Sequence, residues 1–307
     1  MNKNNLTFLF PGQGSQYKGM GLNIYKNFSI AQETYKKASE ILGYDLQKIS
    51  FDLSNNKINE TIYTQPAIFT YNIAIDKILK EFNYNPKAVA GHSLGEYSAL
   101  VSNGCLSFEN ALNIIKCRAK EMDRCGLKRP GKMAAIINLS FSEIENIISK
   151  LKNNAVIANY NSYKQIIISG DSKDIDDIIF YFKKNKIKRI IPLNVSGAFH
   201  SPLMEDAKIS LEKIINNTKF NDVKVPIYQN NMPNKNFKGD KIKNNLINQL
   251  TSPVLWLDTI NNIVKDNFTD FIEAGPGNVL KNLNKNIKKD LNNVDYKDLI
   301  KEWKIKT

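Results

Sequence analysis

The run Gly91-His92-Ser93-Leu94-Gly95 sets a serine between two glycines, directly after the apolar stretch Ala88-Val89-Ala90. The segment from Leu94 to Asn103 has helical composition, and Gly104 is a natural helix stop. A strand, a sharp turn and a helix in this order form a nucleophile elbow, which leaves the serine hydroxyl exposed. G-x-S-x-G also occurs by chance as an ordinary strand-to-helix turn. Because both flanking elements are present, the run favours a catalytic serine at position 93.

A serine hydroxyl is a poor nucleophile near neutral pH unless a base takes its proton. The chain contains only two histidines. His92 adjoins the serine and is expected to project away from the hydroxyl across the turn. A lone histidine is more often structural, but a serine elbow needs a base, so His200 is the predicted one. No sequence feature picks out an acidic partner before His200. We therefore expect a backbone carbonyl or an amide to orient it, as part of a Ser-His dyad.

The helix that follows Ser93 places backbone N–H groups, that of Leu94 first, where an oxyanion would develop. The predicted buried strand Leu6–Phe10 opens into the glycine loop Pro11–Gln16. Gln13 in this loop would supply a second donor if the first strand lies beside the elbow strand. Taken alone, the loop would be a plain turn.

A second helix is expected from Ser107 to about Cys125, ending at Gly126. On it, Ala111, Ile115, Arg118 and Met122 fall on one face. An arginine on an apolar stripe either extends its guanidinium to the surface or meets a buried anion. In the second case it would form a bidentate clamp on a substrate carboxylate. A serine acyl-enzyme with such a clamp implies an acyl group that carries its own carboxylate.

Two stretches come close to nucleotide-binding motifs without completing one. Gly12-x-Gly14 has Tyr17 where a dinucleotide fingerprint needs its third glycine. The stretch from Gly126 to Lys132 has the glycine and lysine spacing of a phosphate loop, but it follows a helix, and Met133 replaces the magnesium-binding Ser or Thr. Both are interpreted as ordinary loops.

Helices and strands alternate along the chain, which predicts an α/β fold with a mainly parallel sheet. Between residues 131 and 196 the predicted order is β-α-β-β-α-β, the ferredoxin-like pattern. We therefore expect a large α/β catalytic domain of residues 1–130 and 197–307, with residues 131–196 inserted as a ferredoxin-like small domain. The predicted strands are Met133–Leu139, Ala155–Asn159, Gln165–Ser169, Arg189–Val195, Val223–Tyr228 and Asp270–Ala274, and the helices include one after the capping box Ser140–Glu143, one from about Lys173 to Lys184, and one around Trp256–Val264.

The net charge of +13 at first suggests a nucleic-acid or membrane surface. However, the lysines are scattered among asparagines and isoleucines, with no dense arginine tract, so we expect no nucleic-acid partner. An acidic protein partner or an anionic substrate explains a basic surface equally well. Three cysteines without a C-x-x-C pair indicate neither a disulfide framework nor a metal site.

The early apolar run Leu6–Phe10 is too short for a signal-peptide core, and no stretch approaches the length needed to span a bilayer. These observations favour a cytoplasmic protein without a membrane partner, or one in an organelle stroma if a targeting segment was removed. Nothing in the sequence demands more than a monomer.

Several runs, spread in order over almost the whole chain, carry a specific family resemblance. They are Phe10-Pro11-Gly12-Gln13-Gly14-Ser15-Gln16, Gly91-His92-Ser93-Leu94-Gly95-Glu96-Tyr97-Ser98-Ala99, Cys117-Arg118 with Met122, Ala158-Asn159-Tyr160-Asn161-Ser162, Gly197-Ala198-Phe199-His200-Ser201, Gln249-Leu250 with Pro253-Val254 and Trp256, and Glu273-Ala274-Gly275-Pro276-Gly277. In these runs the chain resembles the malonyl-CoA:acyl carrier protein transacylases of fatty-acid synthesis. The resemblance implies a hydrolase-like α/β body with a ferredoxin-like insertion.

The resemblance also implies roles for individual residues. Ser93 would be the nucleophile and His200 the base, while Arg118 would bind the malonyl carboxylate. The backbone N–H groups of Gln13 and Leu94 would form the oxyanion hole.

The segment at Gln249 would supply the acceptor that orients His200. Relatives that prefer malonyl groups tend to carry a phenylalanine just before the histidine, as Phe199 does here. The implied substrates are malonyl-CoA and the phosphopantetheine thiol of acyl carrier protein, with no cofactor and no metal. Whether the pathway makes fatty acids or polyketides stays open.

Two alternatives use the same residues. A serine esterase or thioesterase would hydrolyse its acyl-enzyme with the same dyad, whereas a charge-selective site at Arg118 suits a transferase. A non-catalytic binding subunit would keep the fold and would be indifferent to the loss of Ser93.

Overall fold

The structure, a computed structural model, describes residues 5–54, 56–187 and 189–300 and is built on a six-stranded sheet in the order β10-β9-β1-β2-β7-β8. The pairs β10–β9, β9–β1, β1–β2 and β2–β7 are parallel, and β8 runs antiparallel to β7. The strands are β1 (Leu6–Phe10), β2 (Ala88–Gly91), β7 (Ile227–Tyr228), β8 (Lys235–Asn236), β9 (Asp270–Glu273) and β10 (Asn292–Val294). Phe10 on β1 pairs with Gly91 on β2, so the glycine loop and the elbow leave the sheet side by side.

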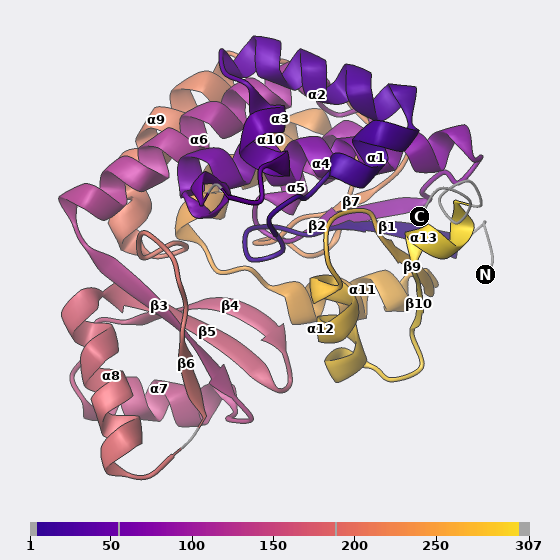
Figure 1. The fold of residues 1–307 in the computed structure, drawn as a ribbon. Helices are drawn as coiled ribbons and strands as arrows, with labels where there is room; N and C mark the ends of the chain where they lie inside the picture. Colours follow the sequence, from indigo (N-terminus) through magenta and orange to yellow (C-terminus); the bar gives the residue numbers. More distant parts are fainter. Residues whose placement is uncertain (1–4, 55, 188, 301–307) are drawn as a thin grey trace.

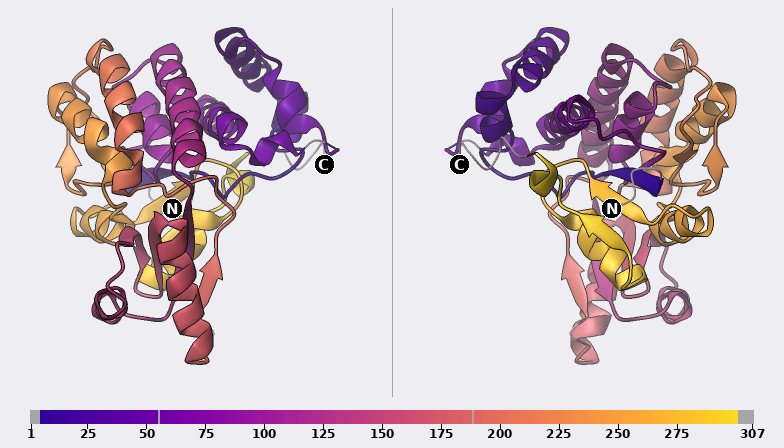
Figure 2. Two further views of the ribbon diagram at one scale, coloured as in Figure 1. Left: turned by 90° about the vertical axis from the view of Figure 1, so that its left-hand side faces the viewer. Right: turned by 90° about the vertical axis from the view of Figure 1, so that its right-hand side faces the viewer.

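Helices cover both faces of this sheet (Figures 1 and 2). The larger group is α1 (Leu22–Asn27), α2 (Ser29–Leu42), α3 (Leu46–Phe51), α4 (Thr61–Glu81), α5 (Gly95–Ser102), α6 (Phe108–Lys128), α9 (Glu205–Asn216) and α10 (Gly239–Asn248). The smaller group is α11 (Trp256–Lys265) and α12 (Val279–Ile287), and the short α13 (Tyr296–Leu299) follows β10. Short 3₁₀ turns span Lys57–Asn59, Pro202–Met204 and Gln249–Thr251.

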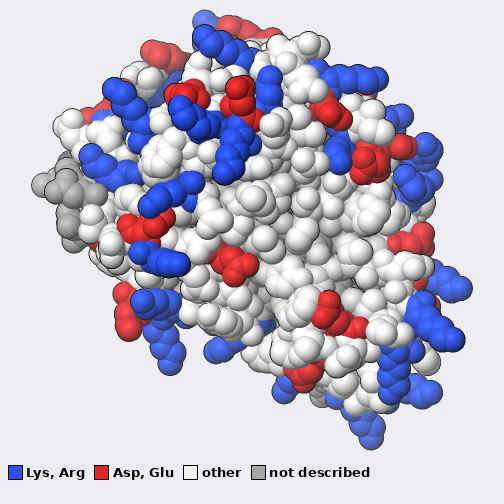
Figure 3. Space-filling model, turned by 180° about the vertical axis from the view of Figure 1, so that it is seen from behind, with Lys and Arg blue, Asp and Glu red and all other residues white. Residues whose placement is uncertain are grey.

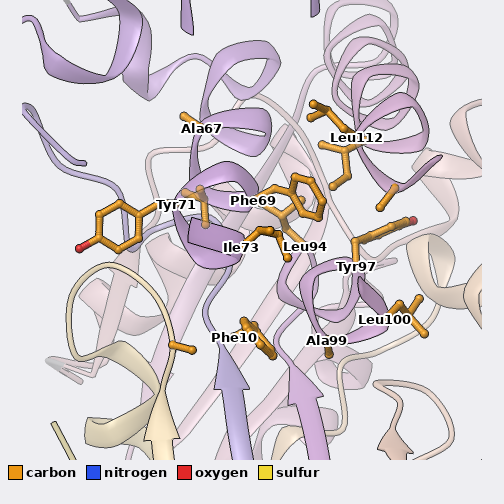
Figure 4. Close-up of a cluster of buried hydrophobic side chains, with 14 of the residues drawn as sticks. Phe10, Ala67, Phe69, Tyr71, Ile73, Leu94, Tyr97, Ala99, Leu100 and Leu112 are labelled. Carbon is orange, nitrogen blue, oxygen red and sulfur yellow. The ribbon is translucent and has the colours of Figure 1, made fainter. Parts of the chain in front are cut away.

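The alternation of side chains along the strands explains this layering. Phe8 and Phe10 of β1 join the large core that includes α4, α5 and α6, whereas Leu9 between them joins a second core with α11 and α12. A strand buried on both faces belongs to a parallel sheet between helical layers. Figure 4 shows side chains of α4 and α5 gathered over the end of β1 at Phe10. Both faces of the predicted sheet are therefore buried.

A separate antiparallel sheet, in the order β4-β5-β3-β6, forms what we call the small unit (residues 131–192; Figure 1). The elements follow the predicted order β-α-β-β-α-β: β3 (Gly131–Ile137), α7 (Phe141–Lys150), β4 (Val156–Ser162), β5 (Gln165–Asp171), α8 (Ser172–Lys184) and β6 (Ile190–Pro192). The predicted capping box at the start of α7 is present, with Ser140 Oγ accepting from Glu143 N and the Glu143 carboxylate accepting from Ser140 N.

The two faces of the sheet in the small unit pack against different partners. Ala134 and Ile168 belong to a core shared with α7 and α8. Their neighbours Met133, Ala135 and Ile167 lie on the opposite face and join the large core of the rest of the molecule, which we call the body. The small unit is thus folded around its own core and packed onto the body by its other face.

A backbone bridge ties the outer strand of the small unit to the body. Tyr160 N on β4 donates to Val254 O at 2.9 Å, and Val254 N donates to Ala158 O at 2.8 Å. Val254 lies between the 3₁₀ turn at Gln249 and α11. The bridge therefore connects β4 with a loop of the body that starts at the site described below.

Several predicted boundaries were wrong, among them those of α6, β7 and β6. Helix α6 does not end at Gly126 but continues to Lys128, and Gly126 is a glycine because a Cβ there would lie 2.1 Å from Ser196 O. The strand predicted at Val223–Tyr228 shortens to β7, because Val223 bonds instead to Phe237 across the edge of the sheet. The strand predicted at Arg189–Val195 shortens to β6, although backbone bonds to β3 flank it on both sides, with Ile137 N donating to Arg189 O and Leu193 N donating to Met133 O.

Positive and negative side chains are not separated on the face that points away from the viewer in Figure 1. Figure 3 shows Lys and Arg lying mainly toward the margin of this face, interleaved with Asp and Glu. This distribution agrees with the scattered lysines of the sequence.

Candidate active site

The elbow is formed by β2 and α5, and its two glycines are required by close packing. A Cβ at Gly91 would lie 2.0 Å from the backbone of Gly95, and one at Gly95 would lie 1.9 Å from Phe10 O. Between them Ser93 has φ +49°, a left-handed conformation that costs a non-glycine residue of the order of 1 kcal/mol or more. The predicted strand, turn and helix are all present, and Ser93 lies at the tip of the turn.

His200 lies against Ser93, as predicted by elimination. Ser93 Oγ is 2.8 Å from His200 Nε2, and His200 Nδ1 lies 3.1 Å from both Gln249 O and Ser252 O. Because two carbonyl oxygens face Nδ1, that nitrogen carries the proton, and Nε2 is left to accept from the serine hydroxyl. Gln249 thus supplies an acceptor through its backbone, and Ser252 is a second acceptor that the sequence did not indicate.

The surroundings of His200 favour the neutral form of the imidazole, which is able to accept a proton. The side chain is 4% exposed, and burial together with the charge of Arg118 lowers its pKa to about 3. The two carbonyl acceptors oppose this shift without reversing it.

Arg118 is fully buried, which excludes the surface-reaching alternative. Its Nη2 donates to Ser93 Oγ at 3.0 Å, and its Nη1 donates to Gln65 Oε1 at 2.8 Å. The guanidinium also lies over the Tyr97 ring, 5.6 Å from the centroid. Burial lowers the pKa of Arg118, yet a guanidinium stays charged in proteins. A buried cation to which no carboxylate of the described residues is hydrogen-bonded therefore lies beside the nucleophile.

His92 projects away from the serine hydroxyl, as expected. Its Nε2 lies 2.8 Å from Asn161 Oδ1 on β4, and its ring is 5.5 Å from that of Trp256. The second histidine therefore joins the elbow to the small unit and takes no part in the contact with Ser93.

A cavity of about 410 Å³ opens at Ser93, between the body and the small unit. The body contributes the glycine loop, the elbow and the first turn of α12, and the small unit contributes β3, β4 and β5. The lining residues that matter below are Gln13, Ser93, Leu94, Arg118, Asn161, Phe199 and His200.

The two residues predicted to donate to the oxyanion, Gln13 and Leu94, come from neighbouring loops at the ends of paired strands. The conditional prediction that the first strand pairs with the elbow strand is met, and His92 N donates to Phe10 O at 2.9 Å. A side chain at Gly12 would reach to 3.5 Å from Leu94 N, so the glycine loop is in close approach to the elbow. Gln13 and Leu94 both line the cavity with Ser93.

Sequence reasoning missed three polar residues that are buried around the elbow. Gln65 bonds Arg118, Asn230 bonds the Ser93 backbone, and Glu96 accepts from both Asn230 and Gln249. Gln65 stood out only as an amide in the otherwise largely apolar helix α4, and Glu96 directly follows the elbow glycine. Asn230 had no local signal, because its partners lie far away in the sequence.

Within the described residues, no group of three or more His, Cys, Asp or Glu side chains is arranged to hold a metal ion. Over the same part of the chain, none of the helices combines the length and apolar character that a membrane crossing requires.

The fold and site have close counterparts among known proteins. The family model described as "Acyl transferase domain" matches residues 7–305, so the chain is an acyltransferase of this class. Malonyl CoA-acyl carrier protein transacylase of Bacillus subtilis (strain 168) is 37% identical over 296 residues, covering 95% of this chain and 93% of the relative. The chain therefore belongs to the malonyl CoA-acyl carrier protein transacylase family.

Solved structures agree. The malonyl-CoA:ACP transacylase of Synechocystis sp. PCC 6803 superposes with a TM-score of 0.88 at 35% identity, covering 95% of this chain and 96% of that one. A malonyl-transacylase solved in complex with a holo type II PKS acyl-carrier protein gives a TM-score of 0.91 at 30% identity, covering 98% of this chain and 99% of that one.

Proposed function

We propose that the protein transfers a malonyl group from malonyl-CoA to the phosphopantetheine thiol of an acyl carrier protein, through a malonyl-serine intermediate on Ser93. The observation that carries the proposal is the buried Arg118 guanidinium, whose Nη2 lies 3.0 Å from the nucleophilic oxygen. Because its bonded partners among the described residues are neutral, this buried cation selects an acyl group with its own carboxylate. The names of the relatives support the same substrates.

In the first half-reaction the Ser93 hydroxyl attacks the thioester carbonyl, and its proton passes to His200 Nε2. The negative charge that develops on the carbonyl oxygen is held by the backbone N–H groups of Leu94 and Gln13. As the tetrahedral intermediate collapses, the C–S bond breaks, and coenzyme A leaves with the proton from His200. The malonyl-serine ester remains, with its carboxylate paired to Arg118.

In the second half-reaction the carrier protein's thiol gives its proton to His200 and attacks the ester. The C–O bond to Ser93 breaks, and the serine oxygen regains the proton. A thioester is consumed and a thioester is formed, so the transfer is reversible. The chemistry requires no cofactor. Phe199, buried in the cavity wall directly before His200, limits the space beside the malonyl methylene.

Two features of the fold support this assignment. We infer a hydrolase-like catalytic domain of residues 1–130 and 197–307, since the nucleophile lies on a strand-turn-helix elbow of a mainly parallel sheet. We infer a ferredoxin-like domain of residues 131–196 from its element order and its strand order β4-β5-β3-β6. Acyl carrier proteins are acidic, and the net charge of +13 would speed their encounter with the enzyme.

Intact-mass measurement after mixing with malonyl-CoA, methylmalonyl-CoA or acetyl-CoA tests the proposal. The expected result is a malonyl adduct on Ser93 that persists until holo carrier protein is added and then disappears as malonyl-carrier protein forms. Hydrolysis of the adduct as fast as its transfer would establish the esterase alternative. Ser93→Ala is the control, because its mass must not change.

A further inference from the structure

Glu96 is a fully buried carboxylate in the first turn of α5, three residues after the nucleophile. Both of its oxygens accept hydrogen bonds: Oε1 from Gln229 Nε2 at 3.0 Å, and Oε2 from Asn230 N at 2.9 Å and Gln249 Nε2 at 3.2 Å. The donors are all neutral amides. Glu96 is not among the residues that line the cavity, so it lies behind the elbow.

Two of these partners hold the strained backbone of Ser93. Asn230 Oδ1 accepts from Ser93 N at 2.7 Å, and Asn230 Nδ2 donates to Gly91 O at 2.6 Å. Gln249 Nε2 donates to Ser93 O at 2.9 Å. A residue at φ +49° persists only when its surroundings fix it. The Ser93 N–H is held by the side chain of Asn230, whose backbone N–H is bonded to Glu96. The Ser93 carbonyl is held by the side chain of Gln249, which is itself bonded to Glu96.

Glu96 also determines which way the Gln249 amide points. A carboxylate only accepts hydrogen bonds, so Gln249 must present Nε2 to it. Gln249 Oε1 then faces Arg118 Nη2 at 3.5 Å, while the backbone oxygen of the same residue accepts from His200. Gln249 therefore contacts the nucleophile, the base and the buried cation, and Glu96 fixes its orientation.

We propose that Glu96 is a positioning residue of the acyl transfer, which holds Ser93 and Gln249 in their reactive arrangement from behind the elbow. The proposal rests on the proposed function for its substrate, but not for its geometry. Because Glu96 touches neither the acyl donor nor the cavity, its loss affects kcat and leaves KM nearly unchanged. A misplacement of about 1 Å at the reacting atoms is enough to lower a rate about 100-fold.

Glu96→Gln tests this, because it keeps the size of the side chain while pointing an amide at neighbours that are themselves donors. We expect kcat for malonyl transfer to fall about 10- to 100-fold, with KM for malonyl-CoA within about threefold. Labelling of Ser93 by a small alkyl fluorophosphonate, which carries no carboxylate for Arg118, should slow by a similar factor.

Asp76→Asn is the matched control. Asp76 is also a buried carboxylate, but it lies on α4, where it accepts from Lys80 and Ser102 away from the cavity. We expect this variant to lower Tm while kcat and labelling stay within about threefold of the wild type. A Glu96→Gln enzyme with the kcat of Asp76→Asn would overturn the proposal, and so would a raised KM with an unchanged kcat.

If Glu96→Gln does not fold, Gln229→Leu decides the question. It removes one donor to Glu96 without touching Ser93, His200 or Arg118. Labelling about three- to tenfold slower supports the positioning role, and unchanged labelling contradicts it. A wild-type enzyme that reacts with the fluorophosphonate but takes no malonyl group would refute the proposed function alone.

Discussion

The body and the small unit contribute to the same cavity in different ways. Among the described residues, every side chain with a hydrogen bond to Ser93 comes from the body: Arg118, His200, Asn230 and Gln249. The small unit contributes walls, with Met133, Ala135 and Ile167 as apolar surface and Asn161 as an amide. The comparison shows that the groups that act on Ser93 come from the body, and that the small unit shapes the space for the substrate. Variants of the body residues that contact Ser93 should therefore lower kcat, and variants of the small unit should change binding or stability.

The largest effect is expected for Ser93→Ala. Without the oxygen no acyl-enzyme forms, and turnover should fall by at least about 10³-fold. The measurement is steady-state transfer of malonyl to holo carrier protein, with circular dichroism to verify the fold. Retained turnover would show that the chemistry does not reside on the body's elbow at all.

Arg118→Ala should reverse the acyl preference. Truncating one partner of a buried charge pair costs about 2–5 kcal/mol, so kcat/KM for malonyl-CoA should fall by roughly 30- to several thousand-fold. The neutral acetyl group loses no partner and should gain relative to malonyl. Competition between malonyl-CoA and acetyl-CoA, read by intact mass of the adduct, measures the ratio. An unchanged ratio would remove Arg118 from the role of clamp.

The rate of acylation should change little as the pH falls from 7 to 5. His200 acts as a base only when neutral, and its pKa lies near 3, so protonation removes the base only well below pH 5. Single-turnover formation of malonyl-Ser93 across this range measures the effect. In Arg118→Ala the acid limb should move upward, because the charge of Arg118 helps to lower the pKa of His200. A wild-type rate that halves near pH 6.5 contradicts this account.

Asn161→Ala should have a modest effect, on substrate binding rather than on kcat. Asn161 lines the cavity and bonds His92 and Gln165, and one hydrogen bond from its amide to the substrate would contribute about 1 kcal/mol, or roughly fivefold in KM. The change should appear mainly in KM for malonyl-CoA. Asn153→Ala, an asparagine of the small unit that does not line the cavity, is the control. A large loss of kcat with unchanged KM would break the division between the two regions.

The smallest effect is expected for Ser140→Ala in the capping box of α7. Its loss should lower the free energy of unfolding by about 1 kcal/mol without changing transfer kinetics. Urea unfolding measures the free energy of unfolding, and Ser149→Ala, at an exposed position of the same helix, is the reference. Altered kinetics would show that the helices of the small unit act on the site.

The sequence was most informative where local rules decide the structure. The elbow could be predicted because two glycines flank a serine between a strand and a helix, and close packing now explains both glycines. His200 could be predicted because only one other imidazole was present. Arg118 was identified from helix periodicity alone, but periodicity left its burial open. Contacts with α4 and α5 settled that burial.

The remainder depends on contacts that no local pattern encodes. Ser252 O reaches His200 only because a loop of the body returns to it, and Asn230 meets Ser93 across a long sequence separation. Gly126 misled the boundary of α6, because a glycine that permits close approach looks the same in sequence as a glycine that stops a helix. Tertiary packing decided each of these cases.

The backbone bridge between β4 and Val254 has a mechanical consequence. Ser252 O accepts a hydrogen bond from the ring of His200, and Val254, two residues later, is bonded to the edge strand β4. One short loop therefore connects this strand with the carbonyl that orients the base. A rigid displacement of the small unit must therefore either break the two bonds at Val254 or pull on the imidazole. The cavity can widen on this side only if the two bonds at Val254 break or the carbonyl that holds the His200 proton moves.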